Sequence, residues 1–341
     1  MIVENYIKTL AELGKSPLLL NKICILPFSG RVMGLYPQED LNVFWINPAL
    51  NATASASDLL TSGKWTNLGG DRTWISPEIE LFIPDLASPR ESYQVPACID
   101  PANYQVLFHH RNMVELETTL MVNFFRSDCK TGLLLNKRIT ELDIPDFPLP
   151  PEVSSAGYEL KCTLSALGIF SPAVRPAIWN LLQVPGGGNI VVPVRNQSIP
   201  ASFFGRQQYR HGGDHICAAI PVLADGYKFG IHAEHCSGLM LYLNLTAPQP
   251  FMVVRRFNVG FADEYFDVPF SNSQQPGSVQ QVYVDDGTYG GFGEMEYHST
   301  AIMPGICAKI TDICTTWSFT GSATKLKDLS ETLLTGKAVK K

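Results

Sequence analysis

The sequence predicts an all-β protein that folds as one large two-sheet sandwich. About fifteen short stretches between residues 22 and 319 have the character of strands, and turn residues separate them at intervals of roughly 8–15 residues. Helical spacing of apolar residues occurs only near the two ends of the chain. Strands therefore do not alternate with helices, which argues against a parallel α/β sheet. No fixed-period repeat is present, which disfavours a propeller or solenoid.

A short helix is expected at the N-terminus. Apolar side chains stand at positions 3, 6, 7, 10 and 13, which is helical spacing, and Gly14 is a plausible stop. We assign residues 1–20 as a helical lead, 21–325 as a single β domain and 326–341 as a C-terminal tail. A second helical pattern, at residues 325–334, lies where that tail begins.

Strands are expected to follow one another through the rest of the chain. Residues 22–35 alternate loosely and break at Gly30 and Gly34. The prolines of residues 142–157 predict a surface connection within one domain rather than a linker between two. The further strands are expected at residues 41–47, 79–83, 104–109, 113–125, 131–140, 158–167, 177–184, 188–194, 216–222, 227–232, 239–245, 251–257, 279–284, 293–298 and 308–319.

Composition and charge argue against several classes of protein. The 341 residues are 45% hydrophobic and 17% charged, which is enough apolar material for a sizeable core. The net charge of −6 and the lack of a basic stripe argue against nucleic-acid binding. Neither a signal peptide nor an apolar run of about 18 residues is visible, so no membrane association is expected. The eight cysteines form no C-x-x-C pair, which predicts free thiols and a cytoplasmic location.

The first candidate for a functional site is the segment 67–78, N-L-G-G-D-R-T-W-I-S-P-E. Arg72 offers a planar fork of hydrogen-bond donors, and Trp74 offers a flat apolar face with a polar edge. Sugars are ringed with hydroxyls and have apolar C–H faces, so this pair suits a sugar site. The alternative is a structural corner in which Arg72 forms a salt bridge with Asp71 or Glu78.

The second candidate is the predicted strand 293–298, G-E-M-E-Y-H. Alternation places Glu294, Glu296 and His298 on one face of that strand. Two carboxylates and an imidazole on one face can serve as acid, base or metal ligand. The alternative is a strand face that only meets solvent.

The third candidate is the strand 177–184, which runs into three glycines. Those glycines resemble a phosphate-binding loop, but no Gly-Lys-Ser/Thr follows and no helix opens after them. Nucleotide binding is therefore rejected, and no cofactor is expected. Trp179, Asn180 and Gln183 are instead candidates to line a sugar pocket.

A histidine-rich segment forms the fourth candidate. His232 and Glu234 share a face if their strand continues, and His235 lies beside them in sequence. These three residues permit a metal site, which would support a lyase or hydrolase, but the spacing differs from the H-E-x-x-H pattern of a zinc helix. We therefore keep metal-assisted chemistry as the weakest alternative and predict no metal site.

Three of these segments together resemble the galactose mutarotase-like superfamily, in particular its less characterised aldose 1-epimerase-like branch. They are the G-G-D-R-x-W-x-x-P-E motif, the tryptophan strand that ends in glycines, and the late E-x-E strand, in that order across most of residues 20–320. The resemblance implies a β-supersandwich of two large antiparallel sheets with a concave face open to a carbohydrate. It also implies a small sugar or an oligosaccharide as the ligand.

The resemblance further implies acid/base interconversion of sugar anomers. Glu296 matches the glutamate that removes the proton from the anomeric hydroxyl, and Arg72 matches a substrate-binding arginine. The histidine that serves as the acid in this family has no counterpart here, where the comparable stretch reads W-N-L-L-Q. His232 is the chosen candidate acid, with His211, His215, His235 and His298 left open. Trp74, Glu78, Trp179, Gln183, Glu294 and His298 are predicted substrate contacts, and a non-catalytic sugar-binding protein is the alternative.

Overall fold

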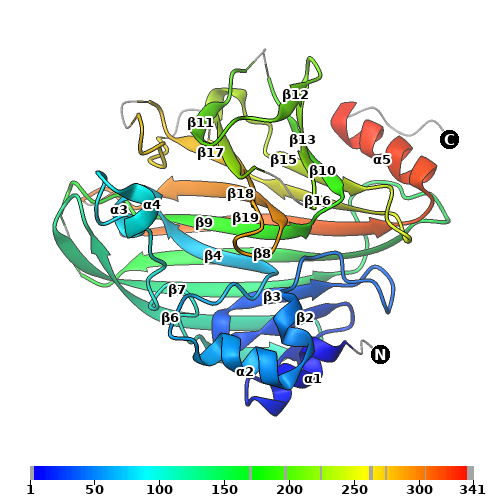
Figure 1. The fold of residues 1–341 in the computed structure, drawn as a ribbon, viewed down its shortest axis with the longest axis horizontal. Coiled ribbons are helices and arrows are strands. Elements are labelled where there is room, and N and C mark those ends of the chain that lie inside the picture. Colours follow the sequence, from blue (N-terminus) through cyan, green and yellow to red (C-terminus); the bar gives the residue numbers. More distant parts are fainter. Residues whose placement is uncertain are drawn as a thin grey trace.

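Two large antiparallel β-sheets make up most of the molecule (Figure 1). The structure is a computed structural model that describes residues 4–168, 171–195, 198–222, 225–260, 264–272, 275–303 and 305–335. Short helices lie at the two ends of the chain and in a few connections within these ranges. The predicted fold class, all-β with two large antiparallel sheets and a short N-terminal helix, is confirmed.

The first sheet carries the candidate segments of the sequence. It has nine strands in the described ranges, and its central strands come from distant parts of the chain. Their order is β1 (Leu18–Leu19), β2 (Ile23–Leu26), β3 (Arg31–Leu35), β4 (Asp71–Ser76), β9 (Ala177–Pro185), β18 (Phe292–Ala301), β17 (Ser278–Val284), β14 (Tyr227–His232) and β11 (Ala201–Phe204).

The second sheet has ten strands in the described ranges and contains the longest strands of the chain. Long neighbours such as β7 and β8 pair over ten consecutive residue positions. The order is β12 (Tyr209–His211), β13 (His215–Ile220), β10 (Gly188–Pro193), β15 (Leu239–Asn244), β16 (Phe251–Phe257), β19 (Lys309–Thr320), β8 (Ser154–Ala166), β7 (Cys129–Leu142), β6 (Met113–Phe124) and β5 (Gln105–His110).

Helices occupy the margins of the sandwich. The N-terminal helix α1 and the C-terminal helix α5 confirm the two helical patterns of the sequence, and residue 326, where we placed the start of a tail, lies inside α5. The α-helices are α1 (Asn5–Glu12), α2 (Thr53–Thr61), α3 (Glu78–Leu81), α4 (Pro89–Ser92) and α5 (Ala323–Thr335), and the 3-10 helices are η1 (Pro27–Ser29), η2 (Pro48–Asn51) and η3 (Ala233–His235).

The central strands of the two sheets are joined by polar contacts as well as apolar packing. Asp71 on β4 accepts hydrogen bonds from Arg255 on β16, and Tyr297 on β18 donates to Asp312 on β19. Residues that precede or follow these on β4 and β18 must point to the opposite face, because side chains alternate along a strand. One face of β4, β9 and β18 therefore belongs to the core, and the other is available for a site.

Two of the predicted strands are wrong. Residues 41–47 form only isolated bridges, such as the pairing of Ile46 with Gly69. Residues 79–83 overlap helix α3, which begins after Pro77. An acidic first turn of Glu78 and Glu80 favours that helix, because carboxylates interact well with the positive end of a helix dipole. A short apolar run does not distinguish strand from helix by its periodicity alone.

The eight cysteines are all free thiols, as the sequence predicted. Four of them, Cys24, Cys162, Cys236 and Cys314, are buried. None of the described helices has both the length and the apolar character needed to cross a bilayer.

Candidate functional site

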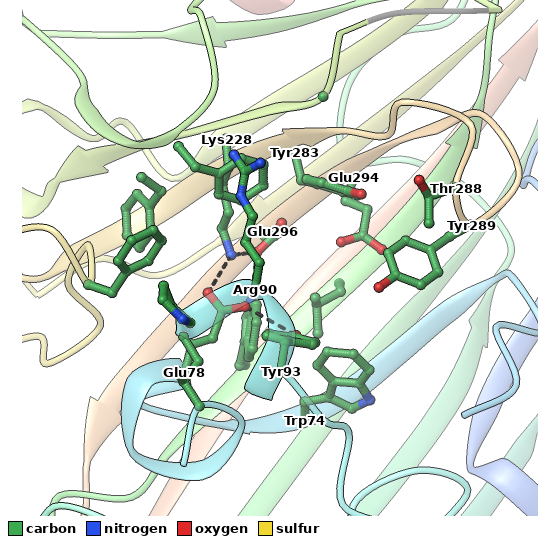
Figure 2. Close-up of a pocket in the computed structure, with 18 of the residues that line it drawn as sticks. Trp74, Glu78, Arg90, Tyr93, Lys228, Tyr283, Thr288, Tyr289, Glu294 and Glu296 are labelled. Carbon is green, nitrogen blue, oxygen red and sulfur yellow. Dashed lines mark hydrogen bonds and ion pairs between the residues drawn. The ribbon is translucent and has the colours of Figure 1, made fainter. Parts of the chain in front are cut away.

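A cavity of about 650 Å³ opens on the outer face of the nine-stranded sheet. Its floor comes from strands β4, β9 and β18, and its walls come from β11, β14, β17, helices α3 and α4 and the loops around them. Figure 2 shows the charged and aromatic side chains that converge there. Six of the predicted site residues line this cavity: Arg72, Trp74, Glu78, Trp179, Glu294 and Glu296.

The register of the central strands explains why these residues meet. Arg72 on β4 lies opposite Leu181 on β9, and Leu181 lies opposite Glu296 on β18. Two residues further along β4, and so on the same face, Trp74 pairs with Trp179, and Trp179 pairs with His298. Positions that are far apart in sequence therefore form adjacent rows on one face of the sheet.

Arg72 forms a buried ion pair with Glu294. The distance from Nη2 of Arg72 to Oε1 of Glu294 is 2.8 Å, and Gln183 donates to the same oxygen at 2.8 Å. The sequence-based alternative of a salt bridge from Arg72 to Asp71 or Glu78 is therefore wrong. Nε and Nη1 of Arg72 are buried without a partner in the described part of the chain. The guanidinium thus keeps donors for a ligand while one nitrogen holds the carboxylate.

Two carboxylates share one buried ammonium group at the other end of the cavity. Nζ of Lys228 lies 3.1 Å from Oε2 of Glu78 and 3.1 Å from Oε2 of Glu296 (Figure 2). Tyr93 donates to Glu78 at 3.2 Å, and Nε1 of Trp179 donates to Glu296 at 2.9 Å. Oε1 of Glu296 is buried and has no partner in the described residues. We call Glu78, Lys228 and Glu296 the shared-proton cluster.

Burial perturbs the protonation of this cluster. It raises the pKa of Glu296 to about 8, with Lys228 opposing the rise and the carboxylates of Glu294 and Glu78 adding to it. It also raises the pKa of Glu78 above its ordinary value, again against the influence of Lys228. Burial alone would lower the pKa of Lys228, but the surrounding carboxylates raise it. The ammonium therefore stays charged, and the two carboxyl groups, whose pKa values burial raises, are the ones that can exchange a proton.

The two tryptophans of the cavity floor pack against aromatic and charged side chains. Trp74 stacks on Phe82 at 4.9 Å, and the guanidinium carbon of Arg72 is 4.2 Å from the Trp74 ring centroid. Trp179 stacks on His298 at 5.3 Å, and the ammonium of Lys228 is 4.6 Å from its ring. Trp74 and Trp179 are only 3% and 1% exposed, so neither ring offers the open flat face that was expected of Trp74.

Gln183 and His298 lie behind the cavity lining, in contact with residues that form it. Gln183 reaches the site through Glu294. Nδ1 of His298 is 3.1 Å from the hydroxyl of Ser76, and the ring backs Trp179. Burial and the charge of Lys228 lower the pKa of His298 well below its ordinary value, so the imidazole stays neutral.

The histidine chosen as the acid, His232, is not among the residues that line the cavity. His232 is the last residue of β14, and its Nδ1 is 3.3 Å from the carbonyl of Gly277, which precedes β17. The other candidates also lie outside the lining: His211 is exposed on β12, His215 pairs with Asp214, and His235 contacts the carbonyl of Arg195. The position of His232 therefore gives no support to its predicted role.

Lys228 is the functional residue that sequence reasoning missed. It is 3% exposed, on the strand Y-K-F-G-I-H, where its neighbours are otherwise apolar or small. A single lysine within such a strand was the available signal, because a buried lysine needs a charged partner. Its partners come from α3 and β18, so their identity required the fold.

The histidine-rich segment does not form a metal centre. Among the described residues, no group of three or more His, Cys, Asp or Glu side chains is arranged to hold a metal ion. Nε2 of His235 lies 3.4 Å from Glu234, while His232 turns toward Gly277. The alternative of metal-assisted chemistry at these residues is therefore not supported.

Comparison with known proteins identifies the architecture. No protein-family model matches the sequence, and no curated protein matches it. A solved structure of a candidate aldose 1-epimerase from Escherichia coli K12 superimposes with a TM-score of 0.51 at 7% identity, covering 89% of this chain and 97% of its own. A galactose 1-epimerase from Lactobacillus acidophilus NCFM gives 0.40 at 10% identity, with 90% and 94% covered.

The chain has the galactose mutarotase-like fold. The resemblance stated from the sequence motifs is thus confirmed as a likeness of fold. Within this galactose mutarotase-like sandwich, the cavity lies over β4, β9 and β18, the three strands that carry those motifs. At such low identity the likeness does not carry a reaction from one protein to the other.

Proposed function

We propose that the cavity binds an aldose and interconverts its anomers by general acid/base catalysis. The observation that carries this proposal is the shared-proton cluster, in which Glu78 and Glu296 lie on either side of one ammonium group. One proton on two carboxyl groups beside Lys228 makes the cluster neutral, and burial favours that state. An acid and a base are then present together in one buried cluster. The cytoplasmic location expected from the sequence is part of the same proposal.

The reaction needs one proton removed and one proton supplied. In the form of the cluster that has its one proton on Glu78, the Glu296 carboxylate takes the proton of the anomeric hydroxyl while Glu78 gives its proton to the ring oxygen. The bond between C1 and the ring oxygen breaks, and the open-chain aldehyde forms. Rotation about the C1–C2 bond followed by the reverse proton transfers gives the other anomer. Groups with pKa values near the working pH suit this exchange best, and burial has moved both carboxyls in that direction.

The Arg72–Glu294 pair supplies orientation in this proposal. The unpaired Nε and Nη1 of Arg72 are donors for sugar hydroxyls, and Trp74 holds the guanidinium plane in place. A carboxylate and a guanidinium side by side can accept from one hydroxyl and donate to the next. Such pairing fixes a sugar ring relative to Glu296, which lies on the same strand as Glu294.

Polarimetry of freshly dissolved aldoses tests the reaction. Wild-type protein is expected to accelerate mutarotation of at least one sugar in a broad panel, and Glu296→Gln is expected to lower kcat by roughly 10²–10⁴-fold. Glu234→Gln is the matched control, because Glu234 is exposed and is not among the residues that line the cavity. The proposal fails if no sugar in the panel is accelerated, or if both variants behave like wild type.

A non-catalytic sugar-binding protein is the second candidate function. It is favoured by one observation: no histidine is among the residues that line the cavity in the described chain. Calorimetry with the same sugar panel separates the two functions. Binding without any acceleration of mutarotation would support the binding protein and remove the epimerase.

A further inference from the structure

The cavity is larger than one sugar ring requires. Its volume of about 650 Å³ lies within the roughly 300–1,000 Å³ of sites that enclose drug-sized ligands, and a single hexose is much smaller than such a ligand. The shared-proton cluster and Arg72 occupy only part of the lining. Beyond Glu294, the lining includes Thr288 and Tyr289 of the loop between β17 and β18 (Figure 2). It also includes Trp65.

The loop between β17 and β18 is held rigidly by one buried carboxylate. Oδ2 of Asp285 accepts hydrogen bonds from the backbone N–H groups of Gly287, Tyr289 and Gly291 at 3.0, 3.2 and 2.8 Å. Its other oxygen accepts from the hydroxyl of Tyr283 at 2.7 Å. Three main-chain bonds to one side chain fix the course of the loop before any ligand arrives. The side chain of Tyr289 is therefore presented in a set position.

Packing under the loop adds to this rigidity. The α-carbon of Gly290 lies so close to Trp45 that an added Cβ would come within 2.3 Å of the indole ring, and Gly290 has a φ of +129°. A residue with a side chain is excluded at this position on both counts. The glycine therefore lets the loop pack against Trp45, while the preceding residue, Tyr289, lines the cavity.

Tyr289 presents an open aromatic surface at this end of the cavity. The residue is 43% exposed, and its hydroxyl makes no hydrogen bond to the described residues. Its ring centroid is 5.5 Å from that of Trp65, which is itself fixed by a 2.8 Å hydrogen bond from Nε1 to Asp100. Trp74 and Trp179, in contrast, are only 3% and 1% exposed. The aromatic surface available for stacking is thus separate from the shared-proton cluster.

We propose that Tyr289 and Trp65 form a second sugar subsite, so that the substrate is the reducing end of an oligosaccharide. This inference rests on the proposed function, because it places the reducing ring at Glu296 and Arg72. The next ring lies beside Tyr289, where its apolar C–H face meets the aromatic ring and its hydroxyls meet the free phenol. The loop that carries Tyr289 is prearranged, so little ordering is required when this ring binds.

Comparison of monosaccharides with disaccharides tests the subsite. We would measure kcat/KM for glucose, galactose, maltose, cellobiose and lactose with wild type, Tyr289→Ala and Tyr289→Phe. At least one disaccharide is expected to exceed its monosaccharide by roughly two- to tenfold. Tyr289→Ala is expected to lose this preference with monosaccharide turnover unchanged, whereas Tyr289→Phe, which keeps the ring, is expected to retain most of it.

The outcomes separate the subsite from the reaction. Equal kcat/KM for monosaccharides and disaccharides in wild type would overturn the subsite, as would an equal loss for both in Tyr289→Ala. If no sugar is turned over, calorimetry with the same five sugars decides. Tighter disaccharide binding that Tyr289→Ala removes would keep the subsite while the proposed reaction fails. Absence of binding by all five sugars would overturn both.

Discussion

Neighbouring residues of one strand, Asp71 and Arg72, belong to two buried charge clusters with different properties. Asp71 faces the second sheet, where Arg255 donates to both of its oxygens at 2.9 and 3.0 Å and Tyr158 donates at 2.5 Å. Arg72 faces the cavity, where Nη2 binds Glu294 and two other nitrogens have no partner. Both side chains are almost fully buried, so burial alone does not distinguish them.

The completeness of hydrogen bonding does distinguish the two clusters. In the cluster around Asp71, Arg255 also reaches the sulfur of Cys314 and the carbonyl of Met295, so each guanidinium nitrogen has a partner. The cavity side keeps unpaired atoms on Arg72 and on Glu296. A buried charge cluster with complete pairing stabilises the fold, whereas one with unpaired atoms beside a cavity is available for a ligand.

The largest expected effect is on the cluster around Asp71. Asp71→Ala leaves Arg255 as an uncompensated buried charge, so we expect the free energy of unfolding to fall by about 3–5 kcal/mol. Urea denaturation measures this loss. Asp146→Ala is the matched control, because Asp146 is exposed in its pair with Arg256, and such a pair contributes about 0–1 kcal/mol. Equal effects of the two variants would contradict the distinction drawn between the clusters.

A smaller effect is expected from Arg72→Lys. The lysine can keep the ion pair with Glu294, but it loses the planar fork that leaves donors for a ligand. We expect the affinity for the tightest-binding sugar of the panel to fall by about 1.5–3 kcal/mol, which corresponds to roughly 10–150-fold. Calorimetry measures this affinity. Urea denaturation should show that Arg72→Lys lowers the free energy of unfolding by less than Asp71→Ala does. The opposite order of the two stability changes would place Arg72 with the structural cluster.

The smallest effect is a displacement of the pH profile. The shared proton belongs to the coupled pair of Glu78 and Glu296, and the raised pKa of Glu296, about 8, marks the loss of that proton from the pair. Activity should therefore decline as pH rises through that value. Lys228 lowers the pKa of Glu296, so Lys228→Met is expected to move this decline upward by about one pH unit. Glu294 raises the same pKa, so Glu294→Gln is expected to move the decline downward. Displacements of the same sign in both variants would exclude the shared-proton cluster as their source.

Alternation along the strands made much of the site predictable. It placed Glu294, Glu296 and His298 on one face of β18, and contacts from Arg72, Lys228 and Ser76 reach them there. Alternation could not show that Asp71 would accept hydrogen bonds from Arg255, because that contact joins β4 to β16 of the opposite sheet. Local patterns give the face of a side chain, while the identity of its partner depends on the fold.

The roles of the aromatic residues were harder to predict than their positions. Trp74 and Trp179 line the cavity as expected, yet Phe82 and His298 cover faces that the sequence left open. Tyr289 was not selected because a single tyrosine carries no spacing signal. Lys228 was not selected although a lysine within a mostly apolar strand signals a buried charge with a partner. Their roles follow from where β14 and the loop after β17 meet the central strands. The sequence therefore predicted which strand face forms the cavity floor and which three segments contribute to it, but it did not predict the full set of side-chain contacts.

The alternation of Asp71 and Arg72 also limits how this protein can change during evolution. Deleting or inserting one residue in β4 would exchange the two faces of that strand, so the core would receive Arg72 and the cavity would receive Asp71. Both clusters would be lost together, and point substitutions are therefore the accessible changes on the floor of the cavity. Changes of length are tolerated where no pairing register must be kept, such as exposed connections between strands.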